Sequence, residues 1–332
     1  MNAGDGETRR RLAGVIARAT GATAATIVAM EPVAGGAVRR HSRLMGDIDG
    51  ASLDLVLRTG GETALGLGLD LADEFTLLRF LHGERLAVPE PILYCGDPAA
   101  IGAPFHLTRT VAGSADPTPL VAAAADDGLA ERLGRMLASI HGIVPSPAAL
   151  AFLGPPPADP ARERLAEFRR LLDAMDEARP AAEWGMRALL LRAPPPASAV
   201  LCHGDFRTGN YLVAAGRPTA VLDWEFAQWG DPDEDLGWFC SRCWRFGAYD
   251  REAGGIGTRA AFERGYAAAS GRRLDPERVH YWEAMAALKW LVIALLQRNR
   301  FLVQGERSLD LALTGRRAAE CEFELLRLTE LW

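Results

Sequence analysis

The chain lacks the features that mark several classes of protein. No apolar stretch reaches the roughly 20 residues that a membrane-spanning helix needs, and charged residues interrupt the first 20 positions, where a signal peptide carries its apolar segment. The formal net charge of −6 gives the chain no overall basic character, which disfavours a nucleic-acid partner. We therefore expect a cytoplasmic protein that binds neither nucleic acid nor membranes.

Cysteine is also scarce, and its five positions are scattered along the chain. An odd, scattered set does not resemble a disulfide framework. Cys240 and Cys243 form one C-x-x-C pair, but no second pair lies nearby to complete a zinc site. We interpret both as thiols packed along a helix.

The first 110 residues read as a strand-rich region. With 332 residues, the chain is too long for one ordinary core and suits two lobes. Residues 51–59 alternate cleanly between apolar and other side chains, as a strand does, and 70–83 carry a helical apolar stripe that ends at a glycine. The patterns predict one more helix and three more strands, at 7–19, 26–33, 88–97 and 104–113.

The rest of the chain reads as mainly helical. The patterns predict helices over 128–143, 161–192 and from 258 to the end, with a small hairpin at 211–222. We therefore predict an α+β protein with a boundary near residue 110.

The stretch LCHGDFRTGNYL, residues 201–212, concentrates reactive side chains between two apolar ends. Asp205 and Asn210 have the spacing D-x-x-x-x-N, in which a phosphoryl-transfer enzyme uses the aspartate as proton acceptor and the asparagine as a Mg²⁺ ligand. Asp223 ends the apolar segment AVLDW and supplies a second hard oxygen ligand. Arg207 is placed to offset charge on the transferring phosphate, and we interpret His203 as a structural residue of the loop.

Each of these residues alone is typical of an ordinary turn, in which aspartate and asparagine cap the backbone. Their combination within some twenty residues instead favours a catalytic loop. A metal-dependent hydrolase using His203, Asp205 and Asp223 is a third interpretation, but it needs more histidine or carboxylate ligands than the sequence shows nearby.

The motif HGDFRTGN…VLDW, followed by WGDPDEDLGWF at 229–239, resembles the aminoglycoside phosphotransferase family. Arg58 and the segment IGAPFHLTRTVAG, residues 101–113, resemble the branch that includes acyl-CoA-dehydrogenase-linked phosphotransferase domains. The resemblance implies a bilobal protein-kinase-like fold: a small antiparallel-sheet lobe with one main helix, residues 1–110, binds nucleotide, and a larger, mostly helical lobe, residues 111–332, holds the catalytic and substrate groups. It implies transfer of the γ-phosphate of ATP or GTP to a hydroxyl of a small molecule, with Mg²⁺, and a buttressing role for Asp235.

The resemblance also assigns nucleotide contacts in the first lobe. Gly35 and Gly36 would form the turn over the phosphates, although Ala37, Val38 and Arg39 replace the family's usual Ser or Asn. Arg58 stands where many kinase-like enzymes carry lysine, and Glu74 would be its partner.

Further contacts would bind the adenine. Val56 shares a strand face with Arg58 and would line the nucleotide cleft. The backbone of Thr108, Arg109 and Thr110 would bind the adenine edge, with Arg109 at a position that is often acidic in the family.

The acceptor and the oligomeric state stay open at this point. Aminoglycosides are polycations and need an acidic pocket, for which the nearby acids are Glu225, Asp231, Asp233 and Glu234. We interpret Asp231 as part of a turn, and Asp233 and Glu234 as solvated charges.

The apolar segment 280–297 carries Trp282 and Trp290. Such a stripe is typical of a core helix, but any part facing the cleft would suit a less polar acceptor, so we favour a small hydroxylated metabolite over an aminoglycoside. The alternative function is a non-catalytic nucleotide-binding scaffold, which Arg58 and the altered glycine turn favour.

Overall fold

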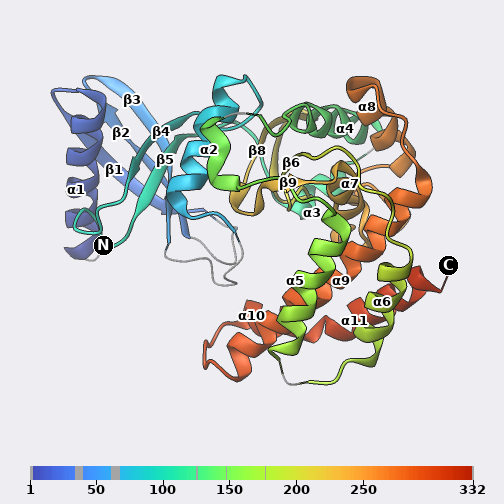
Figure 1. Ribbon diagram of the computed structural model, residues 1–332. Coiled ribbons are helices and arrows are strands. Elements are labelled where there is room, and N and C mark those ends of the chain that lie inside the picture. Colours follow the sequence, from blue (N-terminus) through green and yellow to red (C-terminus); the bar gives the residue numbers. More distant parts are fainter. Residues whose placement is uncertain are drawn as a thin grey trace. The chain divides into compact units, whose positions relative to one another are not determined.

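The computed structural model describes residues 3–33, 40–60, 68–124, 126–146, 148–175 and 177–330 (Figure 1). Its contacts divide the chain into two compact units. The first comprises Met1–Gly113, Leu212–Ala214 and Thr219–Phe226, and the second comprises Ser114–Tyr211, Ala215–Pro218 and Ala227–Trp332. The segment around Asp223 thus belongs with the N-terminal unit, although in the sequence it follows the stretch 201–212, which belongs mostly to the second.

The first unit is built on an antiparallel sheet with strand order β1-β2-β3-β5-β4. Its elements are α1 (Ala3–Thr20), β1 (Ala25–Pro32), β2 (Arg40–Ile48), β3 (Ala51–Thr59), α2 (Leu71–Gly83), β4 (Pro91–Cys95) and β5 (Phe105–Arg109). The sequence patterns missed β2, because Leu44 is its only fully buried residue and the strand lacks a clear alternation.

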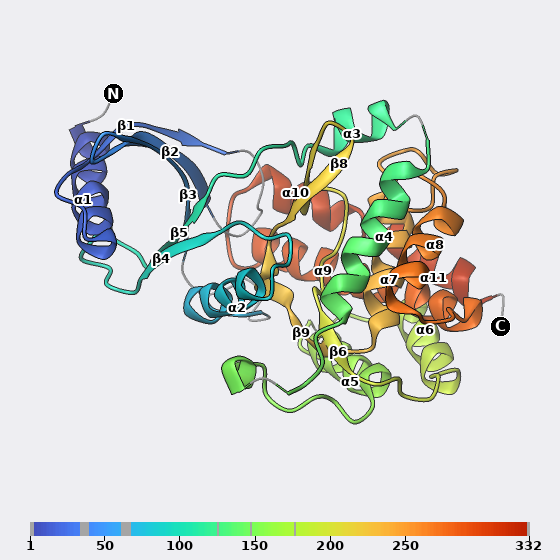
Figure 2. The same cartoon turned by 90° about the horizontal axis from the view of Figure 1, so that it is seen from above.

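Alternation along β3 separates the two faces of this sheet. Leu53, Leu55 and Leu57 join the apolar cluster that contains Leu12 of α1, and both ribbon views show α1 lying along the sheet (Figures 1 and 2). Arg58 follows Leu57 and therefore points to the opposite face, where it meets α2. The sheet thus presents an apolar face to α1 and a charged position to α2.

The second unit is mainly helical, as expected. Its elements are α3 (Pro117–Ala123), α4 (Gly128–His141), η1 (Ala148–Leu153), α5 (Pro160–Asp173), α6 (Pro180–Leu191), β6 (Val200–Cys202), β9 (Gln228–Gly230), α7 (Pro232–Cys240), η3 (Arg242–Trp244), α8 (Arg259–Ser270), α9 (Pro276–Leu302), α10 (Leu309–Arg316) and α11 (Ala318–Thr329). The hairpin strands β7 (Tyr211–Ala214) and β8 (Arg217–Val221) are divided between the two units, and the short helix η2 (Trp224–Phe226) belongs to the first. The single helical stretch expected over 161–192 is wrong, because α5 ends at Asp173 and α6 starts at Pro180. Proline lacks the backbone N–H that would continue a helix through this point.

Helix α9 is the central element of the second unit. It packs against α5, α6, α7, α10 and α11, and it runs among them in both ribbon views (Figures 1 and 2). By length and composition α9 is apolar enough to cross a membrane, but 72% of its most apolar window is buried inside the protein. Tyr281, Trp282 and Leu288 lie in the core cluster that this helix organises, so its apolar character is that of a core helix.

The C-x-x-C cysteines are free thiols. Cys240 ends α7 and Cys243 lies in the short helix η3 that follows. Burial raises the pKa of Cys240 to about 12 and also raises that of Cys243. Both thiols are therefore protonated at neutral pH and pack as apolar groups.

Candidate active site

The carboxylate of Asp205 is held by three side-chain donors of the second unit. Trp238 Nε1 donates to Oδ1 at 2.8 Å. Asn210 Nδ2 and Arg207 Nε donate to Oδ2 at 2.6 and 3.2 Å. Asp205 is only 9% exposed, and an ionised carboxylate accepts hydrogen bonds without donating any. These three hydrogen bonds therefore fix the orientation of the Asp205 carboxylate, the group predicted to be the base.

Local backbone geometry shapes the loop that carries this aspartate. Gly204 and Gly209 have φ values of 77° and 111°, a region that glycine enters at little cost. Asn210 also donates through Nδ2 to the backbone oxygen of Asp205, at 2.9 Å. Because the amide nitrogen of Asn210 is directed at Asp205, its side-chain oxygen is the atom left for another partner, and a hard amide oxygen suits Mg²⁺.

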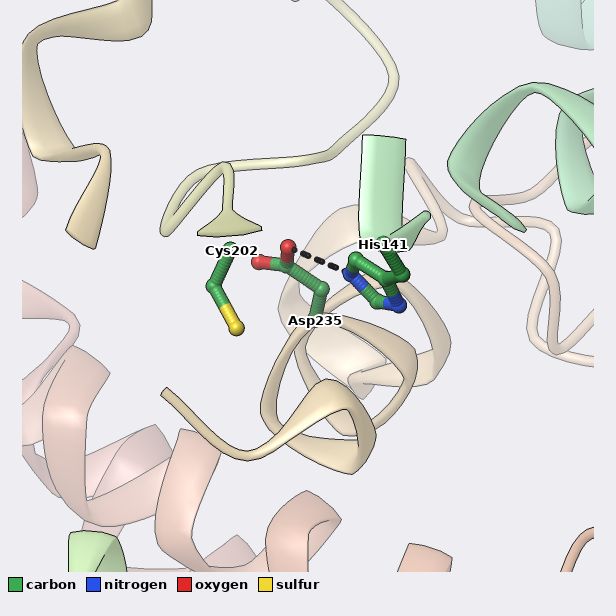
Figure 3. Close-up of side chains that lie close together, drawn as sticks. All are labelled: His141, Cys202 and Asp235. Carbon is green, nitrogen blue, oxygen red and sulfur yellow. Dashed lines mark hydrogen bonds and ion pairs between the residues drawn. The ribbon is translucent and has the colours of Figure 1, made fainter. Parts of the chain in front are cut away.

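Asp235 of α7 anchors the start of the loop, and Figure 3 shows its contact with His141. It accepts hydrogen bonds from the backbone N–H groups of His203 and Gly204, at 2.7 and 2.9 Å, and lies 3.2 Å from His141 Nε2. Burial opposes its charge, but the interactions with His141 and His203 outweigh burial and lower the pKa of Asp235. This is the buttressing contact that the sequence resemblance implied. His203 is a structural residue here too, because its Nδ1 accepts the N–H of Asp205 at 3.1 Å.

His141, Cys202 and Asp235 bring three potential ligand atoms within 4.8 Å of one another (Figure 3). Their chemistry does not suit a metal. Both oxygens of Asp235 already accept backbone N–H groups, and His141 Nδ1 lies 2.8 Å from the hydroxyl of Tyr266. Burial raises the pKa of Cys202 well above its usual value, so this thiol is a donor, and it contacts the backbone oxygen of Asp231. The cluster is a structural anchor.

The acids that follow the motif are neutralised by arginines. Asp231 forms an ion pair with Arg278 at 2.5 Å, and Asp233 pairs with Arg278 and Arg272 at 3.0 and 3.1 Å. Asp233 is 1% exposed, so its interpretation as a solvated charge is wrong.

The same correction applies to Glu234, which is buried and lies 3.3 Å from Arg164. The partners of these acids come from segments distant in sequence, and the local pattern gives no sign of them. These residues therefore form no free acidic surface for a polycation.

In the first unit, Arg58 is surrounded by three carboxylates. Its guanidinium lies 3.3 Å from Glu74, 2.5 Å from Asp223 and 3.5 Å from Glu225. The pair with Glu74 that the resemblance implied is therefore present. Burial opposes the charge, but the three carboxylates raise the pKa of Arg58 above its usual value.

Two features of this cluster fit a cation site. One guanidinium against three carboxylates leaves the four side chains with a formal charge of 1 − 3 = −2, which favours a further cation. Asp223 also has a φ of 64°, in the left-handed region, and a strained backbone of this kind is common at functional positions. Glu225, considered above as an acceptor acid, instead belongs to this cluster.

The residues expected to bind adenine lie within the sheet. Val56 is half-buried and pairs with Thr108 across β3 and β5. The N–H of Arg109 donates to Glu90 O at 2.8 Å, and that of Thr110 to Asp54 O at 3.2 Å. Both N–H groups are therefore already hydrogen-bonded within the unit. An adenine contact here would use the carbonyl oxygens of these residues or would replace the bonds to Glu90 and Asp54. Gly35 and Gly36 lie outside the described residues.

Each unit thus gathers one part of the predicted site. The second unit brings together Asp205, Arg207 and Asn210, and the first brings together Arg58, Glu74 and Asp223. The roles assigned to these residues, and to the adenine-contacting ones, stay predictions. Sequence reasoning missed the side-chain roles of Glu225, Trp238 and His141. Of these, only Trp238 lies inside a quoted motif, WGDPDEDLGWF.

Comparison with known proteins agrees with this architecture. The antiparallel sheet, the loop with Asp205 and the helical second unit define a kinase-like phosphotransferase fold. A Ralstonia eutropha protein described as a candidate aminoglycoside phosphotransferase superposes with a TM-score of 0.75 and 20% identity, covering 97% of this chain and 98% of that one. Spectinomycin phosphotransferase, solved with ADP and spectinomycin, gives a TM-score of 0.65 at 12% identity over 96% and 98%.

The family model for the phosphotransferase enzyme family matches residues 11–282, and the chain belongs to this family. Acyl-CoA dehydrogenase family member 11 of Gallus gallus is 31% identical over 172 residues, 49% of this chain but only 22% of that protein. Other structures of the same fold hold GDP or AMP-PNP. The predicted family and the α+β kinase-like fold are confirmed.

Replacing Arg58 tests the buried charge cluster. Arg58→Gln leaves Glu74, Asp223 and Glu225 without their shared cation, so we expect a loss of about 3–5 kcal/mol in the free energy of unfolding. Arg109→Gln is the control, because Arg109 forms an exposed pair with Glu90, where a change of at most about 1 kcal/mol is expected. Urea denaturation measures both. Equal and small losses of unfolding free energy in the two variants would show that burial of the three carboxylates does not require the charge of Arg58.

Replacing Asp235 tests the loop anchor through its pH dependence. Asp235→Asn places an amide against the N–H groups of His203 and Gly204, and we expect a loss of about 2–3 kcal/mol at neutral pH. The folded-state pKa is lowered, so the contribution of the carboxylate is complete above the unfolded value of about 4 and declines below it.

The difference between the wild type and Asp235→Asn, followed by urea denaturation, should therefore be constant above about pH 5 and shrink below about pH 4. Asp173→Asn, at a mostly exposed position of α5, is the control. A difference that grew on acidification would contradict the assigned charge state of Asp235.

Proposed function

We propose that this protein transfers the γ-phosphate of ATP or GTP to a hydroxyl group of a small molecule, with Mg²⁺ as cofactor. The observation that carries the proposal is Asp205, fixed by Trp238, Arg207 and Asn210 as a proton acceptor. Membership of the phosphotransferase enzyme family and the nucleotides bound by proteins of the same fold support it. A cytoplasmic location, without nucleic-acid or membrane partners, stays a prediction.

Asp205 acts as the base in this proposal. It accepts the proton of the acceptor hydroxyl while the hydroxyl oxygen forms a bond to the γ-phosphorus and the bond to the departing nucleoside diphosphate breaks. Its three hydrogen bonds hold the carboxylate in one orientation, which reduces the entropy lost on reaching the reactive geometry. Arg207 lies beside the base and offsets the charge on the phosphate as it is transferred.

The donor set of the chain fits Mg²⁺. The residues that would hold it are Asn210, through its side-chain oxygen, and Asp223, both of which offer the hard oxygen ligands that this ion prefers. When bound, Mg²⁺ neutralises charge on the phosphates of the nucleotide. Arg58 would contact a phosphate, with Glu74 orienting its guanidinium. The remaining nucleotide contacts would come from Gly35, Gly36, Val56, Thr108, Arg109 and Thr110.

A non-catalytic nucleotide-binding scaffold is the second candidate. The observation that favours it is the engagement of Arg58 by three carboxylates, which compete with any phosphate for its guanidinium. Isothermal titration with ATP, with and without Mg²⁺, beside a label-transfer assay distinguishes the two. Metal-dependent nucleotide binding without transfer to any acceptor would favour the scaffold.

Removing the carboxylate of Asp205 tests the catalytic proposal. We expect Asp205→Ala to abolish transfer of label from γ-labelled ATP to hydroxylated acceptors, while the affinity for ATP changes little, because Asp205 interacts with the acceptor hydroxyl. Asp173→Ala, on α5 of the same unit, is the control and should keep wild-type turnover. Undiminished transfer by Asp205→Ala would refute its assignment as the base.

A further inference from the structure

The chain contains a single lysine, Lys289, among 37 lysine and arginine residues. Lys289 lies on α9, and its ammonium donates a hydrogen bond to the backbone oxygen of Gly204 at 2.6 Å. It also lies 4.4 Å from the ring centroid of Trp238, the residue that donates to Asp205. All the other residues of this set, including Arg58, are arginine, so the only lysine side chain of the printed sequence lies beside the proposed base.

Lys289 has no carboxylate partner within 4.0 Å among the described residues; its contacts are Gly204 O and the face of Trp238. An ammonium group has three N–H donors, and the Gly204 carbonyl accepts one of them. A second cation, Arg207, lies 4.4 Å from the ring centroid of Trp244. Two cations therefore flank Asp205, whose oxygens already accept three hydrogen bonds.

A cluster of tryptophans continues from this point. Trp238, Trp244 and Trp290 contact one another with ring centroids 4.8–6.2 Å apart. The indole N–H groups of Trp244 and Trp290 are buried and have no acceptor in the part of the chain that the structure describes. A buried donor without an acceptor costs free energy, so this part of the aromatic cluster is a polar defect in an otherwise apolar packing.

The aromatic surface also reaches solvent. Phe246 is 43% exposed, contacts Trp244 and has a φ of 48°, which is unusual for a bulky residue. Trp290 lines a small hollow together with Cys243, Cys321, Phe323 and the acids Glu320 and Glu324. Apolar surface is thus available next to the cationic groups for the non-reacting part of a ligand.

The polar groups beside Asp205 are mainly donors, with apolar faces between them, and the acids of the hollow, Glu320 and Glu324, pair with Arg317 and Arg327. A ligand that suits the donors and the apolar faces offers acceptor oxygens, negative charge and an apolar portion. An aminoglycoside offers the opposite, because its ammonium groups would face Lys289 and Arg207, and the acids Asp231, Asp233 and Glu234 are already paired with arginines.

We propose that the phosphoryl acceptor is a hydroxylated compound with an anionic group, such as a hydroxycarboxylate, and an apolar part. Lys289 binds the anionic group, and the half-buried Trp290 and the exposed Phe246, which pack on the buried Trp244, contact the apolar part. The inference rests on the proposed function, since the same ligand gives its hydroxyl proton to Asp205 and receives the γ-phosphoryl group.

The experiment compares matched acceptors. Phenyllactate and aliphatic hydroxycarboxylates of increasing chain length are tested beside their neutral methyl esters and beside kanamycin. Transfer from γ-labelled ATP gives kcat and KM, and quenching of tryptophan fluorescence gives binding without nucleotide. We expect the wild type to use the best carboxylate with a kcat/KM at least about tenfold above that of its ester, and to show no transfer to kanamycin.

Lys289→Met tests the assignment of the cation. We expect it to raise KM and Kd for the carboxylates about tenfold or more and to leave those for the esters unchanged, whereas Lys289→Arg, which keeps the charge, recovers part of the preference. Arg307→Met removes a cation near Phe301, at the end of the same helix, and should behave as the wild type.

Several results would overturn the inference. With the wild type, these results are equal use of esters and acids, preference for kanamycin, or absence of binding by every carboxylate. With Lys289→Met, the contradicting result is an equal fall in kcat for acids and esters. That result would indicate that Lys289 only positions the loop through Gly204. Failure of the proposed phosphotransferase function would give a different set of results. In that case carboxylates would still bind in a Lys289-dependent manner, but no acceptor would receive label.

Discussion

The hydrogen bonds to the carboxylate of Asp205 set the geometry of the candidate active site. Trp238, Asn210 and Arg207 supply them, and Asp235 holds the preceding backbone by two further bonds. Because these donors leave Asp205 little freedom to rotate, its charge is directed to one place. The fold of the second unit, with α7 and α9 packed together, keeps the donors in position.

A second buried charge cluster plays the corresponding role in the first unit. Arg58 balances only part of the charge of Glu74, Asp223 and Glu225, so the cluster has affinity for a further cation and stays stable only while its arginine is present. Arginine also offers more donors than lysine, in a planar fork. This fork allows one side chain to contact three carboxylates.

The sequence predicted what depends on local spacing and periodicity. It identified the strand at 51–59, the helix at 70–83, and the Asp205–Asn210 loop, because each is defined by residues a few positions apart. It missed contacts between distant residues: Trp238 lies 33 positions from Asp205 and Lys289 lies 85 from Gly204. For the same reason it took buried, arginine-paired acids for solvated ones.

The most direct test of the central claim is the single-turnover rate of phosphoryl transfer in Trp238→Phe at saturating nucleotide and acceptor. Phenylalanine keeps an aromatic ring but removes the indole N–H that orients Asp205. We expect a fall of about tenfold or more in this rate with unchanged affinity for ATP. A wild-type rate in this variant would contradict the claim that the hydrogen-bonded orientation of Asp205 sets the chemistry.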